Sequence, residues 1–479
     1  MNRTALSVID RSRFNSLPFT PMVEVMRGLL GLAVVLGLAW AMSNGKTRFP
    51  LRVVAWGLGL QLLLAGVVLG TGVGETALRS AAVGVHNFVS LNVPGASTIF
   101  GDLSWSDRSV PDGTRQMVHD HAHDGPHEHP QQHTYAGETG DGNAHRHSYP
   151  GAQPGFIFAF AATGLLVIIP FAALVGVLYH LGVMQVVIWA MAKVMTATMG
   201  VSGAEAMAIS ANLFVGQTEA PLAVKPYLPA MTPSELMCMM TGGFATVAGS
   251  VLVVYMGVLG PEIGPHLLTA SLLSAPAAVA IAKVVLPETG QPATAGRVEL
   301  RINRTAGNVL EAAATGTTDG LKLYLNVVAM LIAFTFLVQV VNACLGLIWD
   351  ELSVQAILGV ALAPFAWAIG VESWHDAKLV GSLIGIKMTT NEFVAFAQMQ
   401  AYLPAADQGA GFRSERSAQL AAYALCGFAN FASIGIQIGG ISPLAPSRKG
   451  DLSRLALRAM LGGALASAAT AAVAGMFLR

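Results

Sequence analysis

Residues 371–404, VESWHDAKLVGSLIGIKMTTNEFVAFAQMQAYLP, decide the fold. The stretch has two apolar halves, each too short for the roughly 20 residues that a helix needs to cross a bilayer, and a polar junction at Asn391 and Glu392. Lipid offers no hydrogen-bond partner to a free backbone group, so a break at membrane depth must be covered by protein or must line a cavity. The stretch is therefore expected to form a re-entrant helical hairpin.

The composition of the whole chain is that of a polytopic membrane protein. Of its 479 residues, 53% are hydrophobic and only 11% are charged, whereas soluble domains carry roughly 25% charged residues. We expect an all-α fold with about eight transmembrane helices. The candidate spans are residues 22–43, 51–72, 155–180, 235–259, 264–286, 321–349, 416–440 and 454–477. Two weaker stretches, 182–200 and 352–370, are expected to be interfacial or short buried helices.

Charges and cysteines exclude several other classes of protein. Basic and acidic residues each number 27, so the net charge gives no indication of a nucleic-acid partner. The three cysteines lie far apart in apolar segments and predict neither a disulfide framework nor a metal centre. The first apolar run partly resembles a signal peptide, but Glu24 and the long upstream region favour a retained span. The charges beside the first two runs leave the orientation open.

A second interrupted stretch indicates an inverted internal repeat. Residues 202–230 are also broken by polar residues, Gln217-Thr218-Glu219, and are also expected to form a re-entrant hairpin. The motif GFAxxA follows each of the two stretches, first at 243–248 and then at 427–432. Paired, interrupted apolar segments in corresponding halves are typical of transporters that bind their substrate near the membrane midplane.

Two carboxylates stand out as functional candidates. An ionised group at the centre of a bilayer costs roughly 2.5–3.5 kcal/mol, so Glu219 and Glu392 are expected to face a cavity on an ion or substrate path. The alternative is a structural ion pair, with Lys225 or Lys387 from the same stretch. The neighbouring amides Gln217 and Asn391 favour the functional interpretation, because amides offer donors and acceptors to a neutral polar solute.

Several neutral polar residues accompany these acids. Asn430 and Ser433 would share one helical face, as would Thr246 and Gly249, although a polar residue within a span can also serve only to join helices. Asn212 could add a side-chain oxygen to the carbonyls freed by a chain break. Such neutral oxygens suit a monovalent cation.

The segment 105–153 is a histidine-rich loop. It contains HDHAHDGPHEHPQQH and HRH, is rich in glycine and proline, and is expected to be disordered. Weak, labile binding of Zn²⁺, Ni²⁺ or Cu²⁺ is expected because neutral imidazole is a ligand for all three. The imidazoles belong to His119, His121, His123, His127, His129, His133, His145 and His147.

At these motifs the chain resembles the concentrative nucleoside transporters. The signature GxKxxxNEFVA of that family is intact from Gly385 to Ala395 and includes Gly385, Lys387, Asn391, Glu392 and Phe393. The stretches GQTEAPL at 216–222 and GFANFASIGIQIGG at 427–440 also resemble the family in order and spacing. The histidine-rich loop is an insertion that the resemblance does not explain.

The resemblance implies roles for individual residues. It places the nucleobase among Gln217, Thr218, Glu219 and Val251, and the ribose hydroxyls among Glu392, Asn430 and Ser433. In sodium-coupled members the ion would lie at Asn212, Val215, Thr246 and Val247. The resemblance further implies a homotrimer in which a transport domain slides past a scaffold.

These expectations divide the chain into six segments. They are N-terminal transmembrane helices of the scaffold (1–104), the histidine-rich loop (105–153), a transmembrane and an interfacial helix (154–200), the first hairpin with the helices after it (201–286), a connector with an interfacial and a long scaffold helix (287–370), and the second hairpin with the C-terminal helices (371–479).

The function expected from all of this is import of nucleosides across the cytoplasmic membrane by a multi-pass, cation-coupled symporter. Sodium is favoured over a proton as the coupling ion, and no cofactor is expected. One alternative is a metal-ion permease that collects ions on the histidine-rich loop. Another is an intramembrane enzyme, but the chain has no nucleophile motif and no HExxH, so we do not expect an enzyme.

Overall fold

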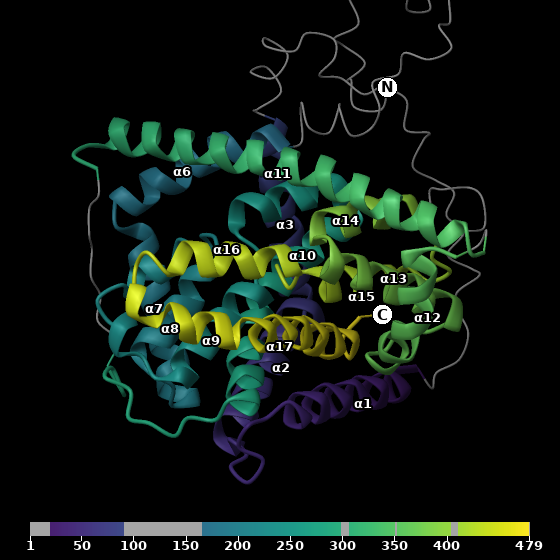
Figure 1. Cartoon of the computed structure of the whole chain (residues 1–479), viewed down its shortest axis with the longest axis horizontal. Coiled ribbons are helices and arrows are strands. Elements are labelled where there is room, and N and C mark those ends of the chain that lie inside the picture. The colour runs from purple at the N-terminus through teal and green to yellow at the C-terminus, as the bar shows by residue number, and fades with distance from the viewer. Residues whose placement is uncertain (1–19, 91–164, 298–305, 350–351, 404–410, 479) are drawn as a thin grey trace, which may run out of the picture.

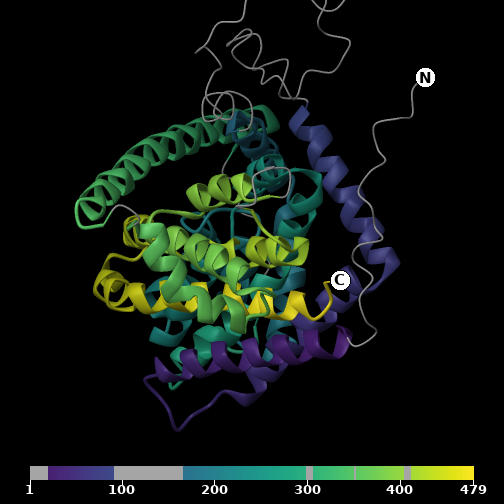
Figure 2. The same cartoon turned by 90° about the vertical axis from the view of Figure 1, so that its right-hand side faces the viewer.

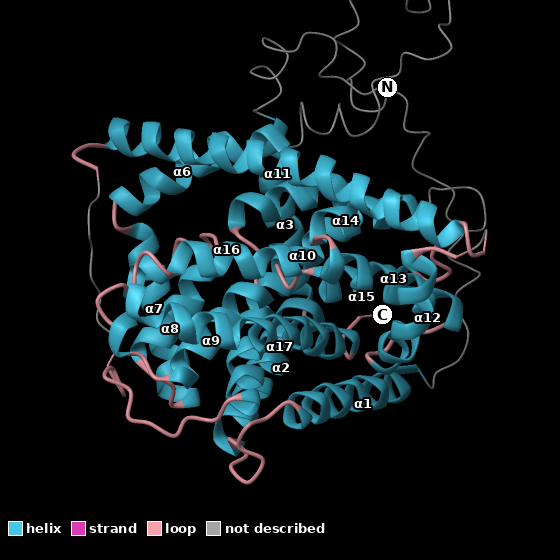
Figure 3. Ribbon diagram, in the orientation of Figure 1, coloured by secondary structure: helices cyan, strands magenta, loops and turns pink. Residues whose placement is uncertain are grey.

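The computed structural model describes residues 20–90, 165–297, 306–349, 352–403 and 411–478. The described residues form helices and no strands, which confirms the helical class (Figure 3). The histidine-rich loop and its eight histidines lie outside the described residues. Within the described residues, no group of three or more histidine, cysteine or acidic residues could hold a metal ion.

The first half of the chain supplies most of the long apolar helices. Its α-helices are α1 (Thr20–Ala41), α2 (Leu51–Gly70), α3 (Gly72–Ser90), α6 (Ile168–His180), α7 (Val183–Met199), α8 (Gly203–Asn212), α9 (Pro233–Ala245) and α10 (Gly249–Val285). Three short 3₁₀ segments accompany them: η4 (Leu165–Val167), η5 (Ala220–Val224) and η6 (Leu228–Ala230).

The second half is more interrupted. It contains α11 (Val309–Gly346), α12 (Val354–Ala368), α13 (Trp374–Thr389), α14 (Glu392–Ala401), α15 (Glu415–Leu425), α16 (Phe431–Ile441), the 3₁₀ segment η7 (Pro446–Arg448) and α17 (Lys449–Gly475). The break between α13 and α14 falls at the Asn391–Glu392 junction, as the sequence indicates.

Fewer helices qualify as membrane spans than the sequence suggests. Among the described residues, five are long and apolar enough: Met22–Ala41, Leu51–Gly70, Pro233–Gly260, Ile263–Val285 and Pro446–Gly475. A sixth is obtained if α6 and α7, which are bent by 77° at their junction, form one span.

The prediction of one continuous span at 416–440 is wrong. The chain leaves helical geometry between α15 and α16, because Gly427 adopts a φ of +138° that favours glycine and Asn430 starts a new helix. A Cβ atom on Gly427 would lie 2.8 Å from the backbone oxygens of Phe244 and Ala245. The predicted span at 235–259 lies within the candidate span Pro233–Gly260, although residues 246–248, between α9 and α10, are not helical.

The helices surround a core built on α17. This helix packs against α1, α9, α10 and α15, and its C-terminal half is almost entirely buried (Figure 1). That half, GGALASAATAAVAG, consists mostly of small residues, which let helices approach closely where lipid provides no hydrophobic drive. The long helix α11 packs along α6, and α11 and α3 lie on opposite flanks of the molecule (Figure 2).

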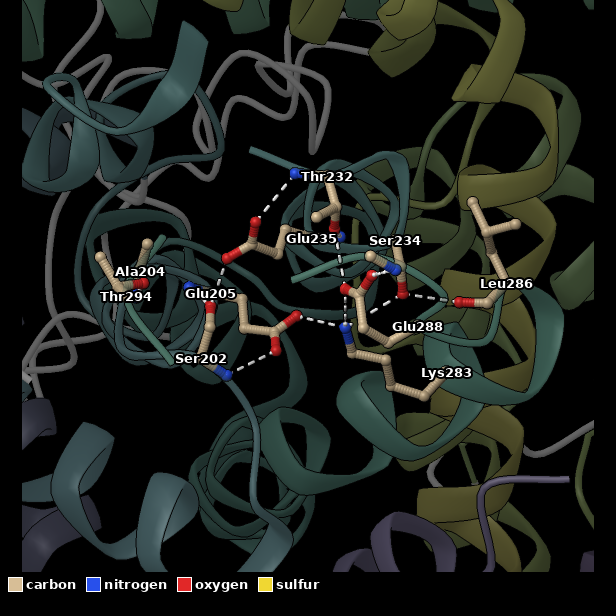
Figure 4. Close-up of polar contacts among 11 residues, drawn as sticks. Ser202, Ala204, Glu205, Thr232, Ser234, Glu235, Lys283, Leu286, Glu288 and Thr294 are labelled. Carbon is tan, nitrogen blue, oxygen red and sulfur yellow. Dashed lines mark hydrogen bonds and ion pairs between the residues drawn. The ribbon is translucent and has the colours of Figure 1, made fainter. Parts of the chain in front are cut away.

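A buried charged cluster fixes the start of the first interrupted stretch (Figure 4). Ser202 and Thr232 each begin a helix with a capping box, completed by Glu205 and Glu235. The Ser202 hydroxyl also donates to Glu235 Oε1 at 2.5 Å, so the starts of α8 and α9 are joined directly. Both S/T-x-x-E patterns can be recognised in the sequence. Only the folded structure shows that the two helix starts are hydrogen-bonded to each other.

Lys283 at the end of α10 neutralises part of this cluster. Its Nζ lies 2.7 Å from Glu205 Oε2 and donates to Ser234 Oγ at 3.0 Å. Glu288 Oε2 lies 3.5 Å from the same Nζ. Partial burial tends to raise the pKa of Glu288, but hydrogen bonds from the Thr232 hydroxyl and the Gly290 N–H, together with Lys283, hold it below its ordinary value. Glu288 is therefore an anion at neutral pH.

We expect Lys283→Met to destabilise the protein by about 3–5 kcal/mol, because it leaves Glu205 buried without a cationic partner. The measurement is the thermal unfolding midpoint of the purified protein in detergent. Lys322→Met is the matched control, since Lys322 pairs with Asp319 at 3.5 Å through side chains that are 70% and 65% exposed. Equal midpoints for the two variants would contradict a structural role for the cluster.

Candidate functional site

A cavity of about 1310 Å³ lies where the two interrupted stretches meet. Its wall is formed by the first turns of α10, α14 and α16, by the break after α8, and by parts of α6 and α11. All seven residues proposed for substrate contact line it: Gln217, Thr218, Glu219, Val251, Glu392, Asn430 and Ser433.

Three helix N-termini point to this cavity. The first-turn residues Ser250 and Val251 of α10, Glu392 and Phe393 of α14, and Ala432 and Ser433 of α16 belong to its lining. A helix N-terminus carries a partial positive charge of roughly half an elementary charge. The site is thus suited to an electronegative oxygen or to a carboxylate.

Glu392 is the carboxylate at this point. It is 5% exposed, its Oε1 accepts a hydrogen bond from the Tyr255 hydroxyl at 2.8 Å, and its Oε2 accepts one from Asn430 Nδ2 at 3.0 Å. A carboxylate has about four acceptor positions, so two further hydrogen bonds from a ligand can be accommodated.

The structure does not form the ion pairs considered as alternatives. Lys387 Nζ donates instead to the Ala424 backbone oxygen at 3.0 Å and to Ser467 Oγ at 3.3 Å. Within the described residues, no ion pair joins Glu392 to Lys387 or Glu219 to Lys225. The two carboxylates therefore remain available to the cavity.

Asn391 and Asn430 begin the helices that carry the site. Asn391 Oδ1 accepts from the Val394 N–H at 2.9 Å, and Asn430 Oδ1 accepts from the Ser433 N–H at 2.8 Å. Asn430 thus caps the turn of α16 that contains Ser433, and both residues line the cavity, as expected for two residues on one face. Each asparagine caps a helix, and Asn430 uses its remaining amide group to hold Glu392.

Thr246 and Gly249, in contrast, lie on the two sides of a break. Thr246 ends α9 and Gly249 begins α10. The expectation that Thr246 and Gly249 share one helical face is therefore wrong, because the chain is not helical between them.

The first stretch brings its polar residues to the part of the cavity wall beside α16. Gln217 is 7% exposed, and Thr218 Oγ1 donates to Glu219 Oε1 at 2.8 Å. Glu219 is exposed and lines the cavity, and Val251, in the first turn of α10, is buried and also lines it.

The four candidate cation residues lie at two neighbouring breaks. Asn212 and Val215 lie at the end of α8, and Thr246 and Val247 lie between α9 and α10. The Gly249 N–H donates to the Phe214 backbone oxygen at 3.2 Å and so joins the two breaks.

The oxygens at these breaks fit a hard monovalent cation. Asn212 is 2% exposed and its Oδ1 has no hydrogen-bond partner, which is costly unless something binds there. Thr246 Oγ1 donates to the Gly242 backbone oxygen at 2.9 Å and keeps its own lone pairs free to accept.

The signature motif divides into two parts. Asn391, Glu392 and Phe393 line the cavity, whereas Gly385 and Lys387 belong to the packing of α13. A Cβ atom on Gly385 would lie 2.5 Å from Leu358 Cβ, so α12 and α13 are in close contact there.

Sequence reasoning misses three residues of the site. Tyr255 holds Glu392, Phe428 lines the cavity, and Gln437 hydrogen-bonds to Gln217 at 3.0 Å. Tyr255 lies in an apolar run with no local signal. Gln437, a lone amide in IGIQIGG, could have been noticed as a polar residue without a solvated face.

Three family models match the chain. Residues 30–103 and 266–475 match the models "Na+ dependent nucleoside transporter N-terminus" and "Na+ dependent nucleoside transporter C-terminus". Residues 162–262 match the model "Nucleoside recognition".

Similar sequences occur in bacteria and in man. An uncharacterized transporter of Haemophilus influenzae is 36% identical over 461 residues, which are 95% of this chain and 98% of the relative. Human sodium/nucleoside cotransporter 1 is 35% identical over 477 residues, which are 96% of this chain but 65% of that longer protein.

Solved structures of similar fold include several conformations of one protein, CNTnw. The structure of CNTnw in an inward-facing, substrate-bound state superposes with a TM-score of 0.80 at 34% identity and covers 95% of this chain and 98% of that one. Variants of CNTnw in outward-facing and intermediate states give TM-scores of 0.78 to 0.80.

We expect Gly440→Ala to lower the thermal unfolding midpoint, by an amount equivalent to about 1–3 kcal/mol of overpacking. Its new Cβ would lie 2.3 Å from Thr218 Cγ2 and would push α16 away from the first stretch. Gly439→Ala is the matched control, because nothing lies within 4 Å of its Cβ position. A midpoint for Gly440→Ala equal to that of the control would refute the close contact.

Proposed function

Since the chain belongs to the family of Na⁺-dependent nucleoside transporters, we propose that it imports nucleosides across the cytoplasmic membrane together with sodium ions. The family assignment makes it a multi-pass transporter of the inner membrane and not an enzyme. The metal-ion permease receives no support from the family assignment and is not proposed.

The observation that carries the proposal is the position of Glu392. Two neutral side chains, Tyr255 and Asn430, hold this carboxylate at the point where three helix N-termini meet. Adjacent hydroxyls are the ligands that a carboxylate with two open acceptor positions binds well, through charge-assisted hydrogen bonds. We assign the ribose to Glu392, Asn430 and Ser433.

The part of the wall formed by the first stretch suits a nucleobase. Gln217, Thr218 and Glu219 offer both donors and acceptors, and Val251 supplies an apolar surface for the ring. No bond needs to form or break during transport.

Sodium is the coupling ion favoured by the oxygens at the two breaks. We assign it to Asn212, Val215, Thr246 and Val247, whose neutral oxygens suit a hard monovalent cation. An ion bound there would order the break after α8, which also carries Gln217. Substrate affinity should then rise with sodium and, by reciprocity, sodium affinity should rise with substrate.

Alternating access completes the proposal. The interrupted stretches 202–230 and 371–404 act as re-entrant hairpins of a transport domain, which slides past a scaffold that includes α11 within a homotrimer. Support comes from CNTnw, which is known in inward-facing, intermediate and outward-facing states.

Glu392→Gln should abolish sodium-driven uptake of radiolabelled uridine into proteoliposomes, because the amide loses one acceptor and the negative charge. The variant should still assemble as the wild type does in size-exclusion chromatography. Glu415→Gln, at an exposed position outside the cavity, should transport normally. Uptake by Glu392→Gln at the wild-type rate would end the ribose assignment.

Asn212→Leu should raise the sodium concentration for half-maximal uptake by about tenfold, equivalent to about 1.4 kcal/mol. Wild-type uptake should collapse when choline replaces sodium and should change little between pH 6 and 8. Asn44→Leu, in an exposed loop, should behave as the wild type. Uptake that follows a pH gradient without sodium would instead identify a proton as the coupling ion.

A further inference from the structure

Gln437 lies behind the cavity and has no explanation in the proposed function. It is on α16, is completely buried, and does not line the cavity. Its own Oε1 is buried without a hydrogen-bond partner, a cost that an apolar side chain would not carry. Any contribution of Gln437 must therefore come from the hydrogen bonds of its amide nitrogen.

That nitrogen makes two hydrogen bonds. Gln437 Nε2 donates to the Met240 backbone oxygen at 3.1 Å and to Gln217 Oε1 at 3.0 Å. A backbone carbonyl can only accept, so the group facing Met240 must be the NH₂ and not the oxygen. The orientation of the Gln437 amide is thereby fixed by the main chain of α9.

The orientation of Gln217 follows from this. Since the Gln437 NH₂ can only donate, Gln217 must turn its oxygen toward α16 and its NH₂ away from it. Within the described residues the Gln217 nitrogen makes no hydrogen bond to protein, and Gln217 lines the cavity. An amide that could rotate freely would offer either group to a ligand, whereas this one is restricted to donating.

A glycine on α9 leaves room for the hydrogen bond between the Gln437 and Gln217 amides. A Cβ atom on Gly243 of α9 would lie 2.6 Å from Gln437 Nε2 and 3.0 Å from Gln217 Cβ. Only glycine lets the two amides meet against α9.

We propose that Gln437 is a specificity-determining positioning residue, which fixes the Gln217 amide so that it presents a donor to the substrate. The inference rests on the proposed function and refines it. A fixed NH₂ favours a base edge that carries an exocyclic oxygen over one that carries an amino group, because two donors facing each other leave both unsatisfied. Uridine should be preferred to cytidine.

The test is the ratio of Vmax/KM for uridine and cytidine, measured by sodium-driven uptake into proteoliposomes with the full-length protein. Gln437→Met removes the donors and keeps the length of the side chain. We expect it to lower the uridine-to-cytidine ratio about 3- to 10-fold, which corresponds to the loss of one typical hydrogen bond. Gln398→Met is the matched control, because Gln398 donates to the Tyr402 hydroxyl at 2.8 Å away from the cavity and should leave the ratio unchanged.

A double-mutant cycle separates this role from general packing. Gln217→Met should lower the ratio by itself, and adding Gln437→Met to it should have no further effect, because Gln437 acts only through Gln217. Gln437→Leu serves as a second variant should Gln437→Met fail to give folded protein, as judged by its thermal midpoint.

Two results would overturn the proposal that Gln437 fixes the orientation of the Gln217 amide. One is a folded Gln437 variant whose ratio stays within twofold of the wild type, and the other is a wild type that prefers cytidine. A wild-type protein that takes up neither nucleoside would refute the proposed function itself. That outcome differs from the two results that would overturn the role of Gln437.

Discussion

A helix can stop inside a membrane only where other groups bind its free backbone N–H and C=O groups, and the whole site depends on how this chain meets that constraint. Asn391 and Asn430 cap the helices that begin at the breaks, and Thr246 ends α9 where α10 is about to start. Each break is covered by the other repeat, since Gly427 lies directly against the main chain of Phe244 and Ala245. Interrupted helices that would be unstable alone become stable as a pair.

The same constraint produces the chemistry of the site. Three helix starts brought together concentrate backbone N–H dipoles at one wall, and this is an environment in which a buried carboxylate can stay charged. Glu392 occupies that wall and is held by Tyr255 and Asn430 rather than by Lys387, so no ion pair occupies its carboxylate oxygens. A lysine partner would have made it a structural residue.

The two ends of α8 have different tasks. Its start is fixed by a buried network of Ser202, Glu205 and Lys283, whereas its end leads into the break with Asn212 and the cavity wall with Gln217. The start is thus held by capping and charged contacts, whereas the end leaves the Asn212 side-chain oxygen without a partner. Gln437 contacts Gln217 in this wall directly, through a hydrogen bond of 3.0 Å from α16.

The sequence by itself determined the helical membrane class, the positions of the polar breaks and the identity of the two carboxylates. These depend on composition and on polar residues in apolar runs, which are local properties that a single chain displays. The comparisons confirm the family that the motif at 385–395 indicates.

Only the tertiary structure decided how those residues are used. A continuous helix was expected at 416–440, because apolar length does not reveal that Gly427 takes a positive φ against another helix. Tyr255 and Gln437 could not be assigned roles from their neighbours in sequence, since their partners Glu392 and Gln217 lie 137 and 220 residues away. Periodicity and composition describe what a segment can become, but a hydrogen bond across such separations exists only once the chain has packed.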